Sequence, residues 1–201
     1  MKDSSSCFNK TSTGLGKVTI MLNNDIDNIK LQQQNRIVDS GSFPKVILLD
    51  TCSYCNLRCC MCFHHQMKRK KGVMSWELFT KIIDEVASED RCVRIWMVFF
   101  GEPFVIRKRK PSIFDMIAYA KRKDLRDIVL NTNGNLMEDE DSLKLIELEL
   151  DAVYVGIDAF TENTYRKIRV GGQYEKVKNN VLSLLRLKKE LKVTKPEVFV
   201  Q

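Results

Sequence analysis

Short apolar runs alternate with segments of helical period from Pro44 to the end of the chain. The runs are rich in β-branched and aromatic residues, as strands are, and the segments between them repeat apolar residues at helical spacing. We expect five strands, at residues 46–50, 93–100, 127–130, 152–157 and 197–200. Helices are expected between them at residues 75–86, 112–122, 141–148 and 162–191.

This alternation predicts an α/β fold. Strands that are apolar almost throughout are typical of parallel sheets covered by helices. Two arrangements fit the pattern, a barrel-like sheet and an open, doubly wound sheet. Five strands cannot close an eight-stranded barrel, so a barrel of this pattern would be incomplete.

The first 43 residues differ in composition from the rest. They are rich in Ser, Asn, Gln, Asp and Lys, and only residues 18–22 resemble a strand. We predict a partly flexible leader over residues 1–43 and a single core domain over residues 44–201. The start of the chain has no apolar signal segment, from which we expect a cytoplasmic protein.

Hydropathy and charge restrict the partners. The longest apolar run, residues 95–100, is far shorter than the roughly 18 residues of a membrane span, so no membrane partner is expected. The chain has 33 Lys and Arg against 26 Asp and Glu, and its basic residues cluster at 68–71 and 107–110. No aromatic interleaving or nucleic-acid motif accompanies these runs, so we interpret them as solvated loops and expect no nucleic-acid partner.

Five of the seven cysteines lie between positions 52 and 62. In a reducing compartment such a cluster indicates a metal site. Cys55, Cys59 and Cys62 form the pattern Cys-x3-Cys-x2-Cys, which suits an iron–sulfur cluster because the cluster offers several irons to one short segment. Three ligands would leave one iron with an open position, as reacting metal sites require.

A zinc site is the alternative interpretation. Cys52 extends the pattern to four thiols, and the two histidines of the chain, His64 and His65, follow closely. Closed zinc sites normally separate their two ligand pairs by more than the three residues available here. We therefore favour an iron–sulfur cluster, with Cys52 and Cys60 as bystanders and both histidines as loop residues.

Further unusual residues follow the carboxyl ends of the later strands. Gly101-Glu102-Pro103 follows the second expected strand, residues 131–134 follow the third, and Asp158 follows the fourth. The cysteine loop follows the first. Each segment alone is an ordinary turn, but parallel strands end at a common rim where α/β proteins build their sites. The sequence thus predicts a single site at this rim.

Together these segments resemble the signature of the radical SAM superfamily. The similar segments are residues 55–62, 101–103, 132–134, 156–159 and 164–169. The resemblance covers residues 44–201 and implies an incomplete (β/α) barrel of the radical SAM type. It also implies a 4Fe-4S cluster held by Cys55, Cys59 and Cys62, with S-adenosylmethionine (SAM) chelating the fourth iron.

The resemblance assigns further residues to SAM. Met61 would pack near the adenine, and the backbone of Gly101, Glu102 and Pro103 would receive the methionine amino group. Arg169 would face the methionine carboxylate, for which a guanidinium fork is well shaped.

Two residues receive a broader assignment, and one position departs from the family. Asn133 and Asp158 are candidates for the ribose or the substrate. Gly156 stands where many relatives have Ser, so one hydroxyl that would bind SAM is missing.

The activity implied by the resemblance is reductive cleavage of SAM to a 5′-deoxyadenosyl radical that abstracts hydrogen from a substrate. The substrate is an unidentified peptide, protein or small metabolite, and the electron would come from a donor such as flavodoxin or ferredoxin, docked at the basic run 68–71. The family core usually has six strand–helix units, so we expect a chain truncated in the fifth. A non-catalytic fragment that binds a cluster or zinc is the alternative, and a nucleic-acid-modifying enzyme that uses the basic runs is a third hypothesis.

Overall fold

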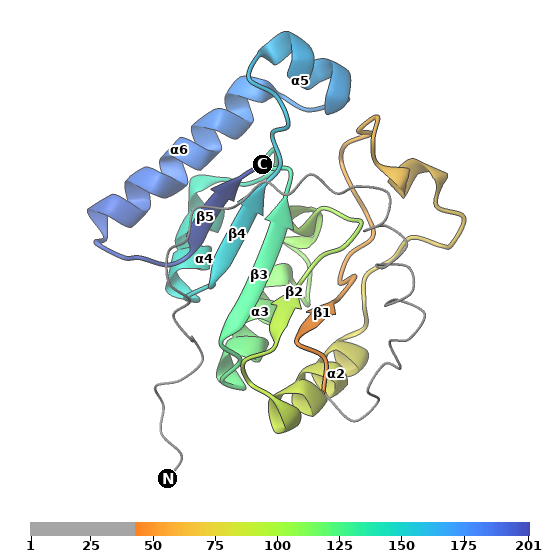
Figure 1. The fold of residues 1–201 in the computed structure, drawn as a ribbon, viewed down its shortest axis with the longest axis vertical. Helices are drawn as coiled ribbons and strands as arrows, with labels where there is room; N and C mark the ends of the chain where they lie inside the picture. Colours follow the sequence, from red (N-terminus) through yellow and green to blue (C-terminus); the bar gives the residue numbers. More distant parts are fainter. Residues whose placement is uncertain (1–42) are drawn as a thin grey trace, which may run out of the picture. The chain divides into compact units, whose positions relative to one another are not determined.

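The computed structural model describes residues 43–201, which Figure 1 shows as a ribbon. The predictions for residues 1–42, including the strand at 18–22, lie outside this range. Pro44–Gln201 form one compact unit. Its strands are β1 (Val46–Leu48), β2 (Arg94–Trp96), β3 (Asp127–Thr132), β4 (Ala152–Val155) and β5 (Glu197–Val200). Its helices are α2 (Trp76–Glu89), α3 (Ile113–Arg122), α4 (Asp139–Glu147), α5 (Glu162–Ile168) and α6 (Tyr174–Glu190), with short 3₁₀ turns η1 (Phe63–Gln66) and η2 (Pro103–Ile106).

The five strands form one parallel sheet in the order β1-β2-β3-β4-β5. A doubly wound sheet reverses its strand order part-way, whereas this sheet keeps the order of the chain. The arrangement is therefore of the barrel type, and the described strands make an open, partial barrel, as expected from the sequence (Figure 1).

The α2 helix illustrates why the local sequence gives these elements. The side chain of Ser75 accepts a hydrogen bond from the backbone N–H of Leu78 and so caps the first turn. Phe79, Ile83 and Val86 follow at helical spacing and are buried. The same capping and spacing define α3, so both helices are fixed by local sequence and by one apolar face.

The two faces of the sheet differ in their covering. Ile95, Ile128 and Val153 lie on one face and are fully buried. On the other face Leu48 is 55% exposed and Phe199 is 39% exposed. The helices therefore cover one face of the sheet and leave the inner face of the partial barrel open.

An aromatic row crosses the open face. The ring of Tyr154 on β4 lies between Trp96 on β2 and Phe199 on β5, with centroids 4.9 and 4.5 Å away. These contacts connect three strands across the sheet. Tyr154, the middle ring of the row, also lines the cavity at the rim of the sheet.

Some expected boundaries were wrong. The second strand ends at Trp96 rather than at residue 100, and β3 continues through Asn131 to Thr132, so its turn starts two residues later than predicted. The helical stretches expected over residues 162–191 are confirmed as two helices, α5 and α6. Gly171 between them has φ +91°, a conformation that a helix excludes. None of the helices in residues 43–201 has the length and apolar character needed to cross a membrane.

Candidate active site

The cysteine loop after β1 is anchored to a distant part of the chain. The backbone N–H of Arg58 donates to the carbonyl of Val170, and that of Cys60 donates to the carbonyl of Ile168, both at 2.9 Å. Leu57 is buried between these segments. The end of α5 thus fixes the course of the loop through backbone hydrogen bonds.

Three thiols of this loop line one cavity at the rim of the sheet. Cys55, Cys59 and Cys62 face a space of about 190 Å³. The cavity is also lined by five other residues that the sequence assigned to the site, namely Met61, Gly101, Glu102, Asn133 and Arg169. Eight of the ten predicted site residues therefore meet at this cavity.

Two thiols receive backbone hydrogen bonds from the loop itself. The N–H of Leu57 donates to Cys55 Sγ at 3.5 Å, and the N–H of His64 donates to Cys62 Sγ at 3.4 Å. Such N–H groups stabilise negative charge on sulfur. The loop is therefore shaped to hold thiolates.

The third thiol contacts a cation. Arg169 Nη1 donates to Cys59 Sγ at 3.7 Å, and the same guanidinium forms an ion pair with Asp158. Burial opposes the charge of Arg169, but Asp158 and Cys59 together hold its pKa above the usual value. Asp158 does not line the cavity and reaches it through Arg169.

Glu102 is a buried carboxylate that connects two strands. It is 1% exposed, and it accepts hydrogen bonds from Thr132 Oγ1 at 2.7 Å, from the N–H of Asn133 at 2.7 Å and from the N–H of Phe104 at 3.2 Å. Burial raises the pKa of Glu102 to about 7, while these hydrogen bonds act to lower it. The carboxylate thereby fixes the turn after β3 against the segment after β2.

Gly101 and Pro103, the other residues of the Gly-Glu-Pro segment, determine the course of the backbone. A Cβ on Gly101 would lie 1.7 Å from the carbonyl oxygen of Cys52, so only glycine allows the two segments to approach this closely. Pro103 is buried, begins η2 and does not line the cavity.

Asn133 extends the contact to the cysteine loop. Its side-chain amide donates to Asn56 Oδ1 at 2.9 Å and lies 3.9 Å from Cys55 Sγ. The turn after β3 is therefore in contact with the first thiol as well as with Glu102.

The structure also brings residues to the cavity that the sequence reasoning missed. Thr132, Tyr154 and Gln201 line it. Thr132 belongs to the marked segment 132–134 but was given no role, and Tyr154 lies on β4 two residues before the marked Gly156. Nothing in the sequence alone states which way a strand residue points. Phe99, Phe100, Asn131 and Gly156 complete the lining.

The zinc interpretation finds little support in the donor geometry. Among residues 43–201, no three His, Cys, Asp or Glu side chains converge on one ion position. Cys52 is fully buried with its thiol directed to the carbonyl of Tyr54, and His64 Nε2 is bonded to the carbonyl of Ser53. A cluster binds each thiolate to a different iron, so separated thiols around one cavity fit it better.

Burial disfavours deprotonation of the thiols when no metal is bound. It raises the pKa of Cys55 to about 11 and also raises the pKa of Cys59 above its usual value. Metal binding replaces the protons of such thiols. The donor set, its N–H groups and the adjoining cavity thus fit an iron–sulfur cluster with a bound small molecule.

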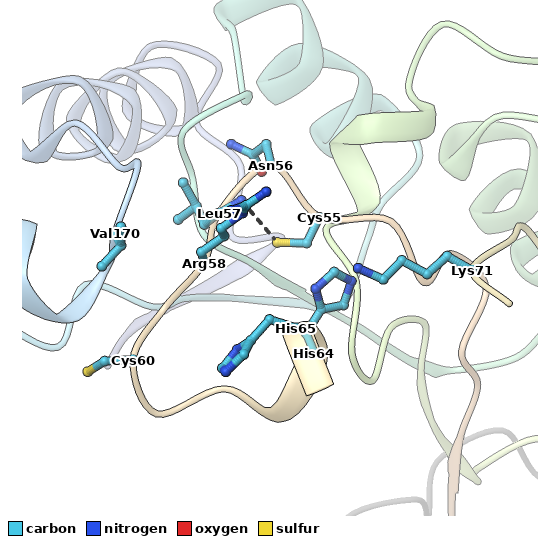
Figure 2. A pocket seen from close by; sticks show the side chains of 9 residues that line it. All are labelled: Cys55, Asn56, Leu57, Arg58, Cys60, His64, His65, Lys71 and Val170. Carbon is cyan, nitrogen blue, oxygen red and sulfur yellow. Dashed lines mark hydrogen bonds between the residues drawn. The ribbon is translucent and has the colours of Figure 1, made fainter. Parts of the chain in front are cut away.

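A second hollow lies against the cysteine loop, and Figure 2 shows the residues that line it. It has a volume of about 780 Å³ and includes Arg58, His65 and Lys71. Its lining contains no carboxylate. Cys55 lines both this hollow and the cavity, so one wall of the cavity lies close to a cationic surface.

Residues 50–194 match the family model described as the radical SAM superfamily. The chain belongs to the radical SAM superfamily. Members of this family use a 4Fe-4S cluster and SAM.

This radical SAM chain is similar to curated proteins of Pyrococcus furiosus and Methanococcus maripaludis. It is 32% identical over 161 residues to the tungsten-containing aldehyde ferredoxin oxidoreductase cofactor-modifying protein of Pyrococcus furiosus, covering 78% of this chain and 43% of that protein. It is 35% identical over 128 residues to a probable GTP 3′,8-cyclase of Methanococcus maripaludis, covering 63% of this chain and 41% of that protein. The chain thus spans less than half the length of these relatives.

Solved radical SAM structures share the fold. The structure titled native anSMEcpe with bound AdoMet and Cp18Cys peptide has a TM-score of 0.59 and 22% identity, covering 79% of this chain and 42% of that one. BtrN in complex with AdoMet and 2-DOIA has a TM-score of 0.53 and 22% identity, covering 63% of this chain and 51% of that one. At this identity the likeness concerns the partial barrel.

Proposed function

We propose that this chain is a radical SAM enzyme that holds a 4Fe-4S cluster on Cys55, Cys59 and Cys62 and binds SAM in the cavity that these thiols line. The observation that carries the proposal is the meeting of eight predicted site residues at that one cavity. The three thiols leave one iron without a protein ligand, which is where SAM would bind.

When bound, these groups supply reductive cleavage of SAM to a 5′-deoxyadenosyl radical that removes hydrogen from the substrate. The chain's own residues bind and orient SAM. The backbone of Gly101 and Glu102, which line the cavity, would bind the methionine amino group, and the Arg169 guanidinium would bind the carboxylate. Pro103 does not line the cavity and would contribute only by shaping this segment. Met61 packs near the adenine.

Asn133 and Asp158 are the residues proposed for the ribose or the substrate. Asn133 is supported by its position in the cavity lining, and Asp158 by its ion pair with Arg169. Glu102 orients this region indirectly, because its buried carboxylate accepts the N–H of Asn133.

A small metabolite is the substrate class that the relatives favour over a peptide or a protein. One relative is named for modifying a cofactor, and another is named a probable GTP 3′,8-cyclase. We propose an electron donor with an acidic surface, such as flavodoxin or ferredoxin, at the hollow beside Cys55. The cationic lining of that hollow, with Arg58 and Lys71, supports this partner.

We place this chemistry in the cytoplasm and assign it to residues 44–201, with residues 1–43 as a leader. The rival proposal is a chain that binds a cluster or zinc without turnover, since these residues form only part of a barrel. SAM cleavage distinguishes the two proposals.

Iron, acid-labile sulfide and zinc per chain, measured on protein purified without oxygen, test the proposal directly. We expect about four irons and about four sulfides per chain, followed by release of 5′-deoxyadenosine when SAM and dithionite are added. Stoichiometric zinc without sulfide would contradict the cluster. Iron and sulfide without SAM cleavage would favour the rival.

A further inference from the structure

Gly156 leaves space that the guanidinium of Arg169 fills. A Cβ built on Gly156 would lie 2.0 Å from Nη2 and 2.9 Å from Cζ of Arg169. These atoms are the far end of a flexible side chain, so any side chain at position 156 would displace the guanidinium rather than the backbone. The lack of a side chain at position 156 therefore lets Arg169 lie where it does.

The position of the guanidinium brings it to a thiol. In the space next to Gly156, the Arg169 guanidinium donates to Cys59 Sγ through Nη1. Its other nitrogens, Nε and Nη2, are paired with Asp158. Cys59 is 6% exposed, and solvent screens such a buried contact only weakly. Asp158 faces Arg169 and offsets part of its charge.

We propose that Arg169 raises the reduction potential of the cluster through the Cys59 thiolate, and that Gly156 and Asp158 set the strength of this effect. The inference rests on the proposed function, because Cys59 must be a cluster ligand. One electron enters the cluster on reduction, and no bond forms or breaks. The reduced cluster carries one more negative charge, so a hydrogen-bonding cation at its sulfur ligand stabilises it.

The test is a redox titration of the anaerobically loaded protein without SAM, with dithionite as reductant and the electron paramagnetic resonance signal of the reduced cluster as readout. Arg169→Gln removes the cation, and we expect at least a tenfold shift of the equilibrium toward the oxidised cluster, which is about 59 mV for one electron. Gly156→Ser keeps the cation but displaces it, and should lower the potential in the same direction. Asp158→Asn leaves the cation uncompensated and should raise it.

Arg166→Gln is the matched control. Arg166 lies on α5, the helix that ends just before Arg169. Its side chain is 70% exposed and paired with Glu162, so its loss should leave the potential unchanged. A purely structural role of Arg169 would not produce opposite signs at positions 156 and 158.

The inference would be overturned if Gly156→Ser had the same reduction potential as the wild-type protein. It would also be overturned if Asp158→Asn had a lower reduction potential than the wild type. Gly156→Ser decides the question if Arg169→Gln fails to load iron, because it retains every ligand and every charge. Iron analysis of the wild-type protein distinguishes failure of the proposed function from failure of this inference. A wild-type protein without a cluster overturns the proposed function together with this inference, whereas a loaded wild type with unchanged variants overturns this inference alone.

Discussion

Glu102 should make the stability of the protein depend on pH in a direction unusual for a carboxylate. Its pKa rises from 4.5 to about 7 on folding, chiefly because of burial. A pKa that is higher in the folded state means that folding favours the protonated carboxyl. The contribution of Glu102 to stability is therefore fully present below its unfolded-state pKa and is lost as the pH rises through 7. One pKa unit corresponds to about 1.4 kcal/mol, so the free energy of unfolding should lose about 3 kcal/mol from this group between pH 4 and pH 8.

The assay is urea unfolding of the metal-free protein under reductant, followed by circular dichroism at several pH values. The difference in unfolding free energy between wild type and Glu102→Gln isolates the group, since the amide does not titrate. We expect the unfolding free energy of the wild type to fall by about 3 kcal/mol relative to that of Glu102→Gln as the pH rises from 4 to 8. Glu89→Gln, at an exposed position on α2, is the control. Parallel pH curves for wild type and Glu102→Gln would refute the reasoning.

Three further predictions follow from the site. Gly101→Ala places a Cβ 1.7 Å from a backbone carbonyl oxygen and should cost about 2 kcal/mol or more in a thermal melt, whereas Gly72→Ala, with no atom within 4 Å of the new Cβ, should melt like wild type. Ala at Cys55, Cys59 or Cys62 should abolish cluster absorbance while Cys52→Ala and Cys60→Ala retain it; a dispensable Cys59 would show the ligand assignment to be wrong. Reversing the charge of Arg58 and Lys71 to Glu should slow cluster reduction by flavodoxin or ferredoxin about tenfold at low salt and little at high salt, and equal rates at low salt would contradict the docking surface.

The fold could be predicted because its signals are local. The Ser75 cap and the apolar spacing of α2 depend only on residues close together in the sequence. Strand–helix alternation indicated a parallel sheet. The boundaries failed where a tertiary contact decides them. Asn131, expected in a turn, is in β3 because the strand continues pairing with β4 to Thr132.

The site was predictable in its residue types and its place at the rim, but not in its contacts. Glu102 belongs to a recognisable motif, yet its three hydrogen-bond donors come from two segments that only the fold brings together. The space above Gly156 that Arg169 fills is likewise invisible in a linear sequence. Side-chain direction on the open face placed Tyr154 in the cavity, and the apolar pattern of β4 gives no sign of it.

The anchoring of the cysteine loop also has a consequence for biosynthesis. The guanidinium that contacts Cys59 lies 110 residues after this thiol, and the backbone partners of Arg58 and Cys60 are Val170 and Ile168. A nascent chain that has not yet released α5 from the ribosome has the thiols without their anchor, and closing so long a loop carries an entropic cost. Iron loading should therefore follow the emergence of α5, and cells that deliver iron during translation would gain nothing from delivering it earlier.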